Sequence, residues 1–340
     1  MGNRNRQVQV AAFGEPAEVA ELAEGAIPEP GLGEVLVRTE FAPINPADLN
    51  VLEGRYGKLP DLPAVIGNEG AGRVAALGAE VEGLAEGDHV IYLGRNDCWQ
   101  DYVVARADEL LRVPGDLDPR AACMLKINPA TAWLLLHQFG SPSAGGWVAQ
   151  NASNSGVGRA VIAIAKAKGW RSINFVRRQE LVPELQAAGA DLVLVDDDGG
   201  KEGAVAALGE DKLGLAFNAV GGDSALRLMS LLGDGGVHIT YGAMAKRPLK
   251  VPNGMLIFRD LQLRGLWLTR WMAAAAREEI ETTYRELAEL MRDGALAQPV
   301  DSTFAPDQIG DALRRALQAG REGKVLLDFR PARGDGKGDG

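Results

Sequence analysis

Apolar residues in the first third of the chain come in short runs separated by glycine and proline, and few of them repeat at helical spacing. Short apolar runs bounded by turn-forming residues are typical of β-strands joined by tight turns. The pattern therefore predicts a compact β-rich domain, of a barrel-like kind, that ends near Pro114. The runs most typical of strands are Val35–Val37, Ala71–Ala76, His89–Leu93 and Tyr102–Val104.

After Asp118 the pattern changes to apolar strands that alternate with helices. A helix is predicted over Ala130–Phe139, and Val157, Val161 and Ile164 share one face of another helix. Apolar strands separated by helices are typical of a parallel sheet covered on both faces. The sequence thus predicts an α/β fold with a doubly wound, Rossmann-type sheet. The predicted strands are Trp147–Gln150, Ser172–Val176, Leu192–Val195, Leu215–Ala219, Val237–Tyr241 and Leu261–Leu268.

The C-terminal part of the chain has a third pattern of apolar residues. Apolar spacing predicts a helix over 280–291 that stops before Gly294, a second helix over 309–317, and a strand at Val325–Leu327. Because the preceding strands already complete a doubly wound sheet, we expect this part to return to the first domain. The predicted domains are 1–119 together with 270–340, and 120–269.

The amino-acid composition and net charge disfavour some classes of binding partner. The chain has 340 residues, with 36 Lys and Arg against 46 Asp and Glu, and a formal net charge of -10. A nucleic-acid-binding protein presents a basic face to the phosphate backbone, so this charge disfavours such a partner. We expect no membrane span and no targeting segment, and hence a cytoplasmic protein whose two cysteines, Cys98 and Cys123, stay reduced.

The loop after Trp147–Gln150 has the composition of a phosphate-binding turn. It reads Asn-Ala-Ser-Asn-Ser-Gly-Val-Gly from Asn151 to Gly158, and a predicted helix follows. Small residues let the backbone approach a pyrophosphate, and a helix N-terminus offers N–H groups and a favourable dipole. The strict GxGxxG spacing is absent, so a tight turn without a ligand is the alternative interpretation. The surrounding strand–helix–strand unit favours the dinucleotide site.

The end of the second predicted strand indicates which dinucleotide this loop binds. An NAD site usually has Asp or Glu there, which holds the ribose 2′-OH. In this chain Ser172–Val176 ends in Arg177 and Arg178. Two guanidinium groups suit a 2′-phosphate through paired, charge-assisted hydrogen bonds. A solvated arginine pair at a helix entry is the alternative, and the missing carboxylate favours NADPH.

The histidines and cysteines do not have the spacing of metal ligands. Catalytic zinc needs three protein ligands and an open position. His89, His137 and His238 lie in three separate neighbourhoods, and Cys98 has no second cysteine near it in the sequence. We therefore predict no metal.

Several stretches of the chain, taken together, resemble one family. They are Asn45–Asn50, Gly54–Gly57, Leu62–Gly70, Asn128–Ala132, Gln150–Gly158, Tyr241–Met244 and Arg264–Trp271. They are similar to the zinc-independent 2-enoyl thioester reductases of the medium-chain dehydrogenase/reductase superfamily, the mitochondrial trans-2-enoyl-CoA reductase type. The resemblance spans nearly the whole chain, and implies a GroES-like, β-rich catalytic domain beside the Rossmann domain. Zinc-dependent members carry Cys and His at the positions of Asn45 and Asn68.

The resemblance also implies site residues. The catalytic tyrosine of the family falls on Tyr56, whose neutral phenol can donate a hydrogen bond or a proton to the thioester. Asn68, Trp267 and Trp271 are candidates for the substrate pocket, although core packing explains the tryptophans equally well. The implied cofactor contacts are Asn45, Asn128, Thr131, Asn154, Ser155, Gly156, Val157, Arg177, Arg178, Tyr241, Gly242, Met244, Leu266, Trp267, Leu268 and Lys324.

The leading hypothesis from the sequence is an NADPH-dependent reductase of 2-enoyl thioesters carried by CoA or an acyl carrier protein. An NADPH:quinone or α,β-unsaturated ketone reductase is the nearest alternative, because such enzymes share the fold and the Tyr56 segment. A protein that binds NADPH without turnover is a third. The family also implies a homodimer, formed by pairing edge strands of the Rossmann sheets.

Overall fold

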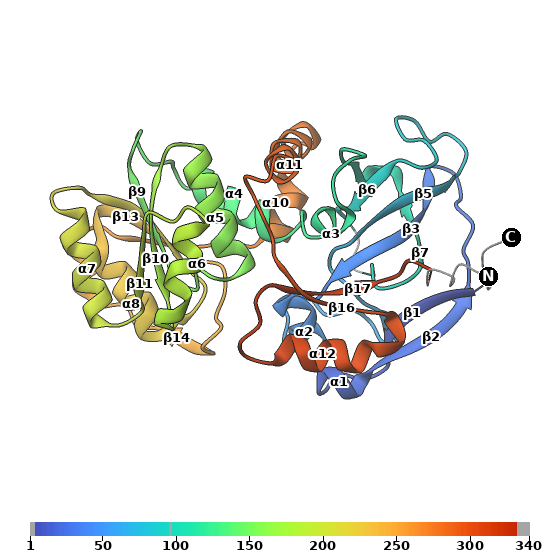
Figure 1. The fold of residues 1–340 in the computed structure, drawn as a ribbon, viewed down its shortest axis with the longest axis horizontal. Helices are drawn as coiled ribbons and strands as arrows, with labels where there is room; N and C mark the ends of the chain where they lie inside the picture. The colour runs from blue at the N-terminus through green and yellow to red at the C-terminus, as the bar shows by residue number, and fades with distance from the viewer. Residues whose placement is uncertain (1–3, 95–96, 332–340) are drawn as a thin grey trace, which may run out of the picture. The chain divides into compact units, whose positions relative to one another are not determined.

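Contacts within the chain separate it into two units, and each is described by itself (Figure 1). The computed structural model describes residues 4–94 and 97–331. The first unit takes the described residues up to Lys126 and from Gln298 onward. The second unit is Ile127–Ala297.

The first unit is built on two sheets. A small antiparallel sheet has the order β2-β1-β4, and a larger one has the order β16-β17-β3-β5-β6-β8, with β7 paired to β3. The C-terminal β17 pairs antiparallel with β3, so the end of the described chain joins this sheet. The strands are β1 (Arg4–Val10), β2 (Ala20–Ala26), β3 (Glu34–Pro43), β4 (Ala64–Val65), β5 (Ala71–Leu77), β6 (His89–Tyr92), β7 (Tyr102–Arg106), β8 (Leu110–Arg112), β16 (Val300–Phe304) and β17 (Lys324–Asp328).

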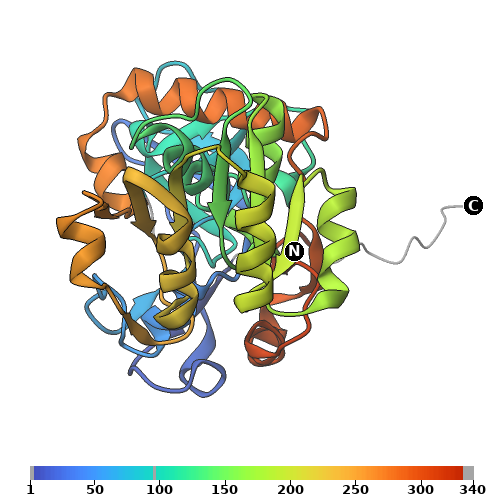
Figure 2. The same cartoon turned by 90° about the vertical axis from the view of Figure 1, so that its left-hand side faces the viewer.

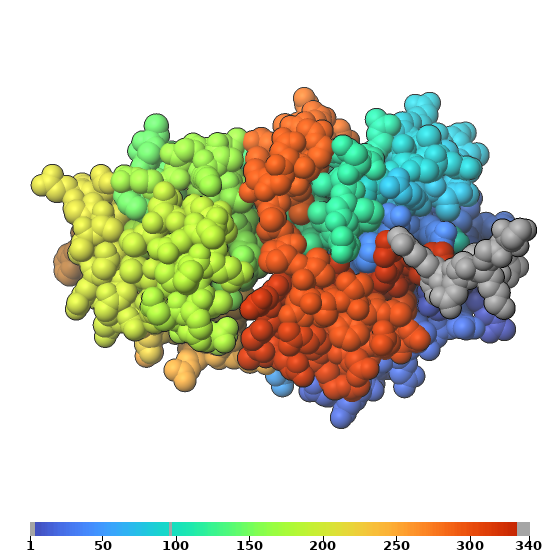
Figure 3. Space-filling view, viewed as in Figure 1, coloured from blue at the N-terminus to red at the C-terminus, as the bar shows by residue number. Residues whose placement is uncertain are grey.

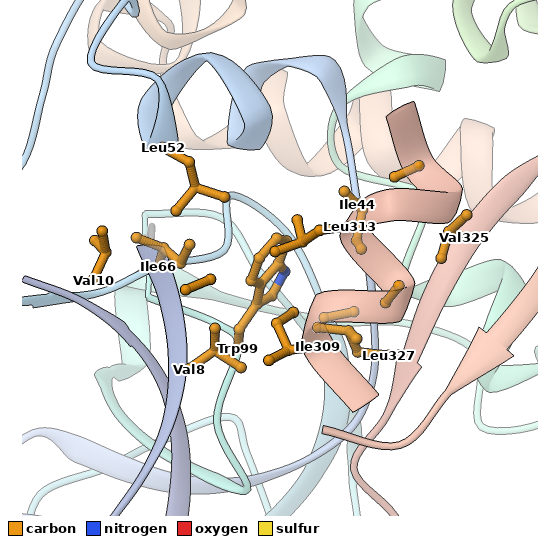
Figure 4. Packing of buried hydrophobic residues seen from close by; sticks show 14 of the residues in the cluster. Val8, Val10, Ile44, Leu52, Ile66, Trp99, Ile309, Leu313, Val325 and Leu327 are labelled. Atoms are coloured by element: carbon orange, nitrogen blue, oxygen red, sulfur yellow. The ribbon is translucent and has the colours of Figure 1, made fainter. Parts of the chain in front are cut away.

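Helices of the first unit cover one apolar cluster between these strands. Trp99 is fully buried at its centre, and Figure 4 shows its ring among Val8, Ile66, Ile309 and Leu313. The last two residues come from one face of α12, whose opposite face is polar, so helical periodicity places the apolar stripe on the core. The helices are α1 (Pro16–Val19), α2 (Pro46–Leu52), α3 (Pro119–Ala122) and α12 (Ile309–Leu317), with single 3₁₀ turns at Ala107–Glu109 and Pro306–Gln308.

The second unit is a parallel sheet with the order β11-β10-β9-β12-β13-β15. Each of the strand pairs is parallel, which gives the chain order 3-2-1-4-5-6 of a Rossmann fold. The α/β prediction with a doubly wound sheet is therefore confirmed. The strands are β9 (Trp147–Gln150), β10 (Arg171–Val176), β11 (Leu192–Val195), β12 (Leu213–Asn218), β13 (Leu232–Thr240) and β15 (Gln262–Gly265), and the short β14 (Arg247–Leu249) lies outside this order.

Helices cover both faces of this sheet. Ile162 of α5 and Leu185 of α6 pack against Val176 on one face, while Leu208 of α7 and Leu228 of α8 lie in the cluster on the other. Figure 1 shows α7 on one side of the strands and α5 and α6 on the other. The helices are α4 (Asn128–His137), α5 (Gly156–Ala167), α6 (Val182–Ala187), α7 (Asp198–Leu208), α8 (Gly222–Leu231), α9 (Asn253–Ile257), α10 (Leu268–Ala274) and α11 (Arg277–Arg292), with a 3₁₀ turn at Gln179–Leu181.

The domain boundary in the structure differs from the one expected from the sequence. Residues 270–297, which the sequence assigned to the first domain, lie in the second unit. The physical reason is α11, the long orange helix at the top of Figure 2, which packs against α4 and buries Ile280, Tyr284 and Leu287. Figure 3 shows part of α11 as an orange surface, and most of the charged residues of this helix are exposed.

The predicted strand Leu261–Leu268 is also shorter than expected. β15 ends at Gly265, and Leu268 begins α10 with Trp267 as its N-cap residue. An apolar run cannot by itself distinguish a strand from the first turn of a helix. No helix among the described residues is both long and apolar enough to cross a bilayer.

Candidate active site

The carboxyl ends of the parallel strands gather most of the predicted cofactor residues at one edge of the second unit. β9 ends at Gln150, β10 at Val176, β13 at Thr240 and β15 at Gly265. Because the strands are parallel, the segments that follow them lie along the same edge, where α/β sheets bind ligands. These segments contain Asn154 to Val157, Arg177 and Arg178, Tyr241 to Met244, and Leu266 to Leu268.

The phosphate-loop candidate after β9 makes a tight turn into α5. Ser155 is the N-cap residue, and its Oγ accepts a hydrogen bond from the N–H of Gly158 at 3.1 Å. A Cβ on Gly158 would lie 2.5 Å from the carbonyl oxygen of Ser153, so only glycine permits this approach of helix to loop. The first turn of α5 thus starts close to the loop, with its dipole favouring an anion.

A buried amide network, which the sequence did not indicate, holds the ends of β9 and β12. Asn151 Nδ2 donates to Asn218 Oδ1 at 2.8 Å and to Ser224 Oγ at 2.7 Å. Asn218 Oδ1 also accepts from the N–H groups of Val220 and Gly221. These contacts fix the loops at the ligand edge, and only the three-dimensional order of β9 beside β12 brings the two asparagines together.

Tyr241 directs its hydroxyl toward this phosphate loop. Burial raises the pKa of Tyr241 and the nearby Ser155 opposes this change, so the phenol stays protonated at neutral pH. The next residues turn back to β12, where the N–H of Met244 donates to the carbonyl of Ala219 at 2.9 Å. A Cβ on Gly242 would lie 3.1 Å from the same carbonyl oxygen. Met244 itself is 54% exposed.

Arg177 and Arg178 follow the end of β10 and are exposed. In the part of the chain that the structure describes, neither has a salt bridge. By contrast, Arg159 in the first turn of α5 is ion-paired with Glu184 of α6 and donates to the carbonyl of Asn154. Within the described residues, the arginine pair therefore carries positive charge at this end of β10 that no salt bridge offsets.

Other predicted residues of the second unit lie at its helix starts. Asn128 and Thr131 are buried in the first turns of α4. Trp267 is 38% exposed, whereas Trp271 is buried and its Nε1 donates to Glu279 Oε1 at 3.1 Å. The polar end of Trp271 is thus satisfied between α10 and α11.

In the first unit, Tyr56 lies four residues beyond the end of α2. The chain leaves the helix through Gly54, which has a φ of 69°, and the N–H of Arg55 donates to the carbonyl of Asn50 at 2.8 Å. Tyr56 is half-buried and packs against the apolar cluster around Trp99. Its position is therefore set by the helix before it and by the core beneath it.

The start of α2 carries a buried polar cluster. The carboxylate of Asp48 accepts from the backbone N–H of Asn45 at 2.7 Å and from the side-chain amide of Asn68 at 2.6 Å. Asn45 Nδ2 donates to Glu69 Oε1 at 2.6 Å, and the ammonium of Lys324 donates to Asn45 Oδ1. The structure thus brings together Asn45, Asn68 and Lys324, which are far apart in the sequence.

A second ammonium belongs to the same cluster. Lys126 Nζ donates to the carbonyl oxygen of Asn68 at 2.5 Å. Burial lowers the pKa of Lys126 and of Lys324, and nearby Glu69 and Asp48 oppose that change. Burial also raises the pKa of Asp48, against the hydrogen bonds from Asn45 and Asn68. Lys126 lies in none of the motifs recognised in the sequence, so its place in this cluster could not be predicted.

Two family models match the chain. One, described as the alcohol dehydrogenase GroES-like domain, matches residues 31–115, and the other, described as zinc-binding dehydrogenase, matches residues 156–289. The mitochondrial enoyl-[acyl-carrier-protein] reductase of Homo sapiens is 38% identical over 331 residues, covering 95% of this chain and 88% of that protein. The Xenopus tropicalis enzyme of the same name is 40% identical over 310 residues, covering 88% and 89%.

The chain belongs to the medium-chain enoyl reductase family.

Solved structures of medium-chain reductases share its fold. A putative NADPH:quinone reductase from Bacillus thuringiensis superposes with a TM-score of 0.89 at 25% identity, covering 96% of this chain and 99% of that one. The mitochondrial 2-enoyl thioester reductase heterodimer of Candida tropicalis gives 0.87 at 25% identity with the same coverage. Proteins named for each of the two substrate classes considered for this chain therefore share its fold.

The donor set of this enoyl reductase does not fit the zinc that one family description names. Among the described residues, no three or more His, Cys, Asp or Glu side chains form a group that could hold a metal ion. Zinc binds lone pairs of nitrogen, sulfur or oxygen. Ammonium groups have none, and Lys324 already donates to the side-chain oxygen of Asn45.

Proposed function

We propose that this enoyl reductase catalyses the NADPH-dependent reduction of the 2,3 double bond of trans-2-enoyl thioesters. The observation that carries the proposal is the identity of 38% to a human enoyl-[acyl-carrier-protein] reductase across 95% of the chain. The phosphate-loop candidate after β9 and the Tyr56 segment after α2 support it, because the loop is held by the N-cap of α5 and Tyr56 by its packing against the core.

The chemistry assigns a role to Tyr56. When bound, NADPH supplies a hydride, which adds to Cβ of the enoyl thioester. Negative charge then develops on the thioester oxygen and at Cα, where a proton is added. The phenol of Tyr56 donates a hydrogen bond or a proton to this developing charge, which an oxygen–hydrogen donor stabilises. Asn128 and Thr131, at the start of α4, are proposed to hold the nicotinamide end of the cofactor.

The preference for NADPH rests on Arg177 and Arg178. Both are exposed, and the strand before them ends without a carboxylate. A guanidinium pair binds a phosphate in paired hydrogen bonds and gives nothing comparable to a 2′-hydroxyl. Replacing both arginines with alanine is expected to raise KM for NADPH at least about tenfold and to leave KM for NADH within about twofold. Equal changes for the two cofactors would remove this assignment.

Substrate class is tested by following NADPH consumption with crotonyl-CoA, trans-2-decenoyl-CoA and 9,10-phenanthrenequinone in parallel. A clear preference for an enoyl thioester is the expected result. Preference for the quinone would promote the second candidate, a quinone or enone reductase, which the likeness to the Bacillus thuringiensis protein favours. Quenching of NADPH fluorescence without consumption of any of the three would indicate a binding protein.

A homodimer is proposed because β15, the strand at one edge of the parallel sheet in the second unit, has a free side within the part of the chain that the structure describes. Among the described residues, β15 is the last strand of the sheet order and pairs with β13 only. Just before it, Ile257 and Phe258 are 69% and 83% exposed. An unpaired edge strand beside exposed apolar side chains is suited to pairing with a second copy.

The cytoplasmic location stays a prediction from the sequence, and the curated relatives are named as mitochondrial proteins.

A further inference from the structure

The polar cluster at the start of α2 contains two cationic and two anionic side chains, all of them buried. Lys126 and Lys324 are 6% and 8% exposed, and Asp48 and Glu69 are 1% and 0% exposed. Burying ionised groups is costly unless each has an opposite charge and hydrogen bonds. The formal charges of the four side chains cancel, so the cluster is neutral only while both lysines are present.

The two ammonium groups also connect segments that are distant in the sequence. Lys324 begins β17 and donates to Asn45, the residue before α2. Lys126 donates to the backbone of Asn68, whose side chain donates to Asp48 in the first turn of α2. Each ammonium group therefore links two distant segments of the chain, as a structural metal ion links the segments that carry its ligands.

We propose that Lys126 and Lys324 form a built-in cationic centre, which takes the place of a metal ion in neutralising this cluster and positions α2 and, through it, Tyr56. The part that concerns Tyr56 rests on the proposed function. In this proposal Lys126 and Lys324 are positioning residues, because they act on Tyr56 through α2. The order along the chain supports this role, since α2 ends four residues before Tyr56 and its first turn is held by the cluster.

The experiment compares Lys126→Met, and the double variant Lys126→Met/Glu69→Gln, with a control. Gln keeps the oxygen that accepts from Asn45 but carries no charge, so the double variant restores neutrality. Lys212→Met is the matched control, since Lys212 is exposed and lies in the second unit. Thermal midpoints, kcat for whichever substrate the wild type reduces, and NADPH Kd by fluorescence are measured for each.

Lys126→Met is expected to lower the thermal midpoint by roughly 5–10 °C and kcat at least about tenfold, with NADPH Kd within about twofold of wild type. The double variant is expected to recover at least about half of both losses, which loss of packing alone would not allow. A single variant that behaves like Lys212→Met, or a double variant that recovers nothing, overturns the proposal. If Lys126→Met does not fold, the double variant must fold and turn over, and failure there also overturns it.

Metal analysis separates this inference from the proposed function. Purified wild-type protein is expected to contain less than about 0.1 zinc per chain, and neither EDTA nor ZnCl2 is expected to move its thermal midpoint. One zinc per chain, with a midpoint that EDTA lowers, would show that a metal and not the lysines neutralises the cluster. These readouts need no substrate, so they hold whichever substrate the enzyme reduces.

Discussion

At the residue scale, Tyr56 has the clearest expected phenotype. Tyr56→Phe removes one oxygen and keeps the ring that packs on the core around Trp99. We expect kcat to fall about 100-fold or more, because one donor to the developing charge is lost, and NADPH Kd to stay within about twofold. Tyr102→Phe in β7 is the matched control and is expected to retain wild-type kcat. Undiminished turnover by Tyr56→Phe would mean that another group donates to the thioester.

A buried histidine gives a prediction for pH. Burial in β13 lowers the pKa of His238 to about 4, against an ordinary value of 6.5, and neither ring nitrogen has a hydrogen-bond partner among the described residues. The unfolded chain therefore takes up this proton at higher pH than the folded protein does. Stability from the neutral ring is complete above pH 6.5 and is lost as the pH falls from there toward 4.

Replacing this histidine should therefore flatten the pH dependence of folding. When the pH falls from 8 to 5, the unfolding free energy of the wild type is expected to drop by about 2 kcal/mol more than that of His238→Leu. Urea unfolding of both proteins at the two pH values measures the difference, and every other titrating group cancels in the comparison. An equal loss in both proteins would mean that His238 titrates in the folded state as it does in water.

At the element scale, the turn from β9 into α5 depends on Gly158. An added methyl group would meet the carbonyl oxygen of Ser153 at 2.5 Å, so Gly158→Ala must shift the loop or the helix start. We expect a loss of about 1–3 kcal/mol in stability and at least about a tenfold rise in NADPH Kd. Gly199→Ala in α7, where the nearest atom would be 3.5 Å away, is the control and is expected to bind NADPH as wild type does. Unchanged binding by Gly158→Ala would show that the loop does not hold the cofactor.

The elements were largely predictable, and the exceptions have physical causes. β9 matches its prediction at both ends, because its apolar run is bounded by turn residues that allow one assignment. β15 ends early, because the same apolar run continues into the first turn of α10. The helix over 280–291 was expected, but a helical period does not reveal which unit it packs against, and α11 packs against α4.

The residues of the candidate site also fall into those that could be predicted from the sequence and those that could not. Residues that follow strand ends could be placed from the sequence, because a parallel sheet brings its carboxyl ends to one edge. The cluster of Asp48, Glu69, Lys126 and Lys324 could not, because it depends on contacts between α2, a loop and the distant β17. Pairs separated by more than two hundred residues leave no trace in local spacing.

At the scale of the whole molecule, the exposed edge of the second unit predicts the oligomeric state. If β15 pairs with its copy, Ile257 and Phe258 become buried in the interface, and wild-type protein should sediment at twice the chain mass of 36.0 kDa. Ile257→Asp with Phe258→Asp places two charges there, which cannot be buried without partners, so this variant should sediment as a monomer. Val205→Asp, at an exposed position of α7, is the control and should remain dimeric. A monomeric wild type at micromolar concentration would contradict the proposed dimer. A dimeric Ile257→Asp/Phe258→Asp variant would show that the interface lies on another surface.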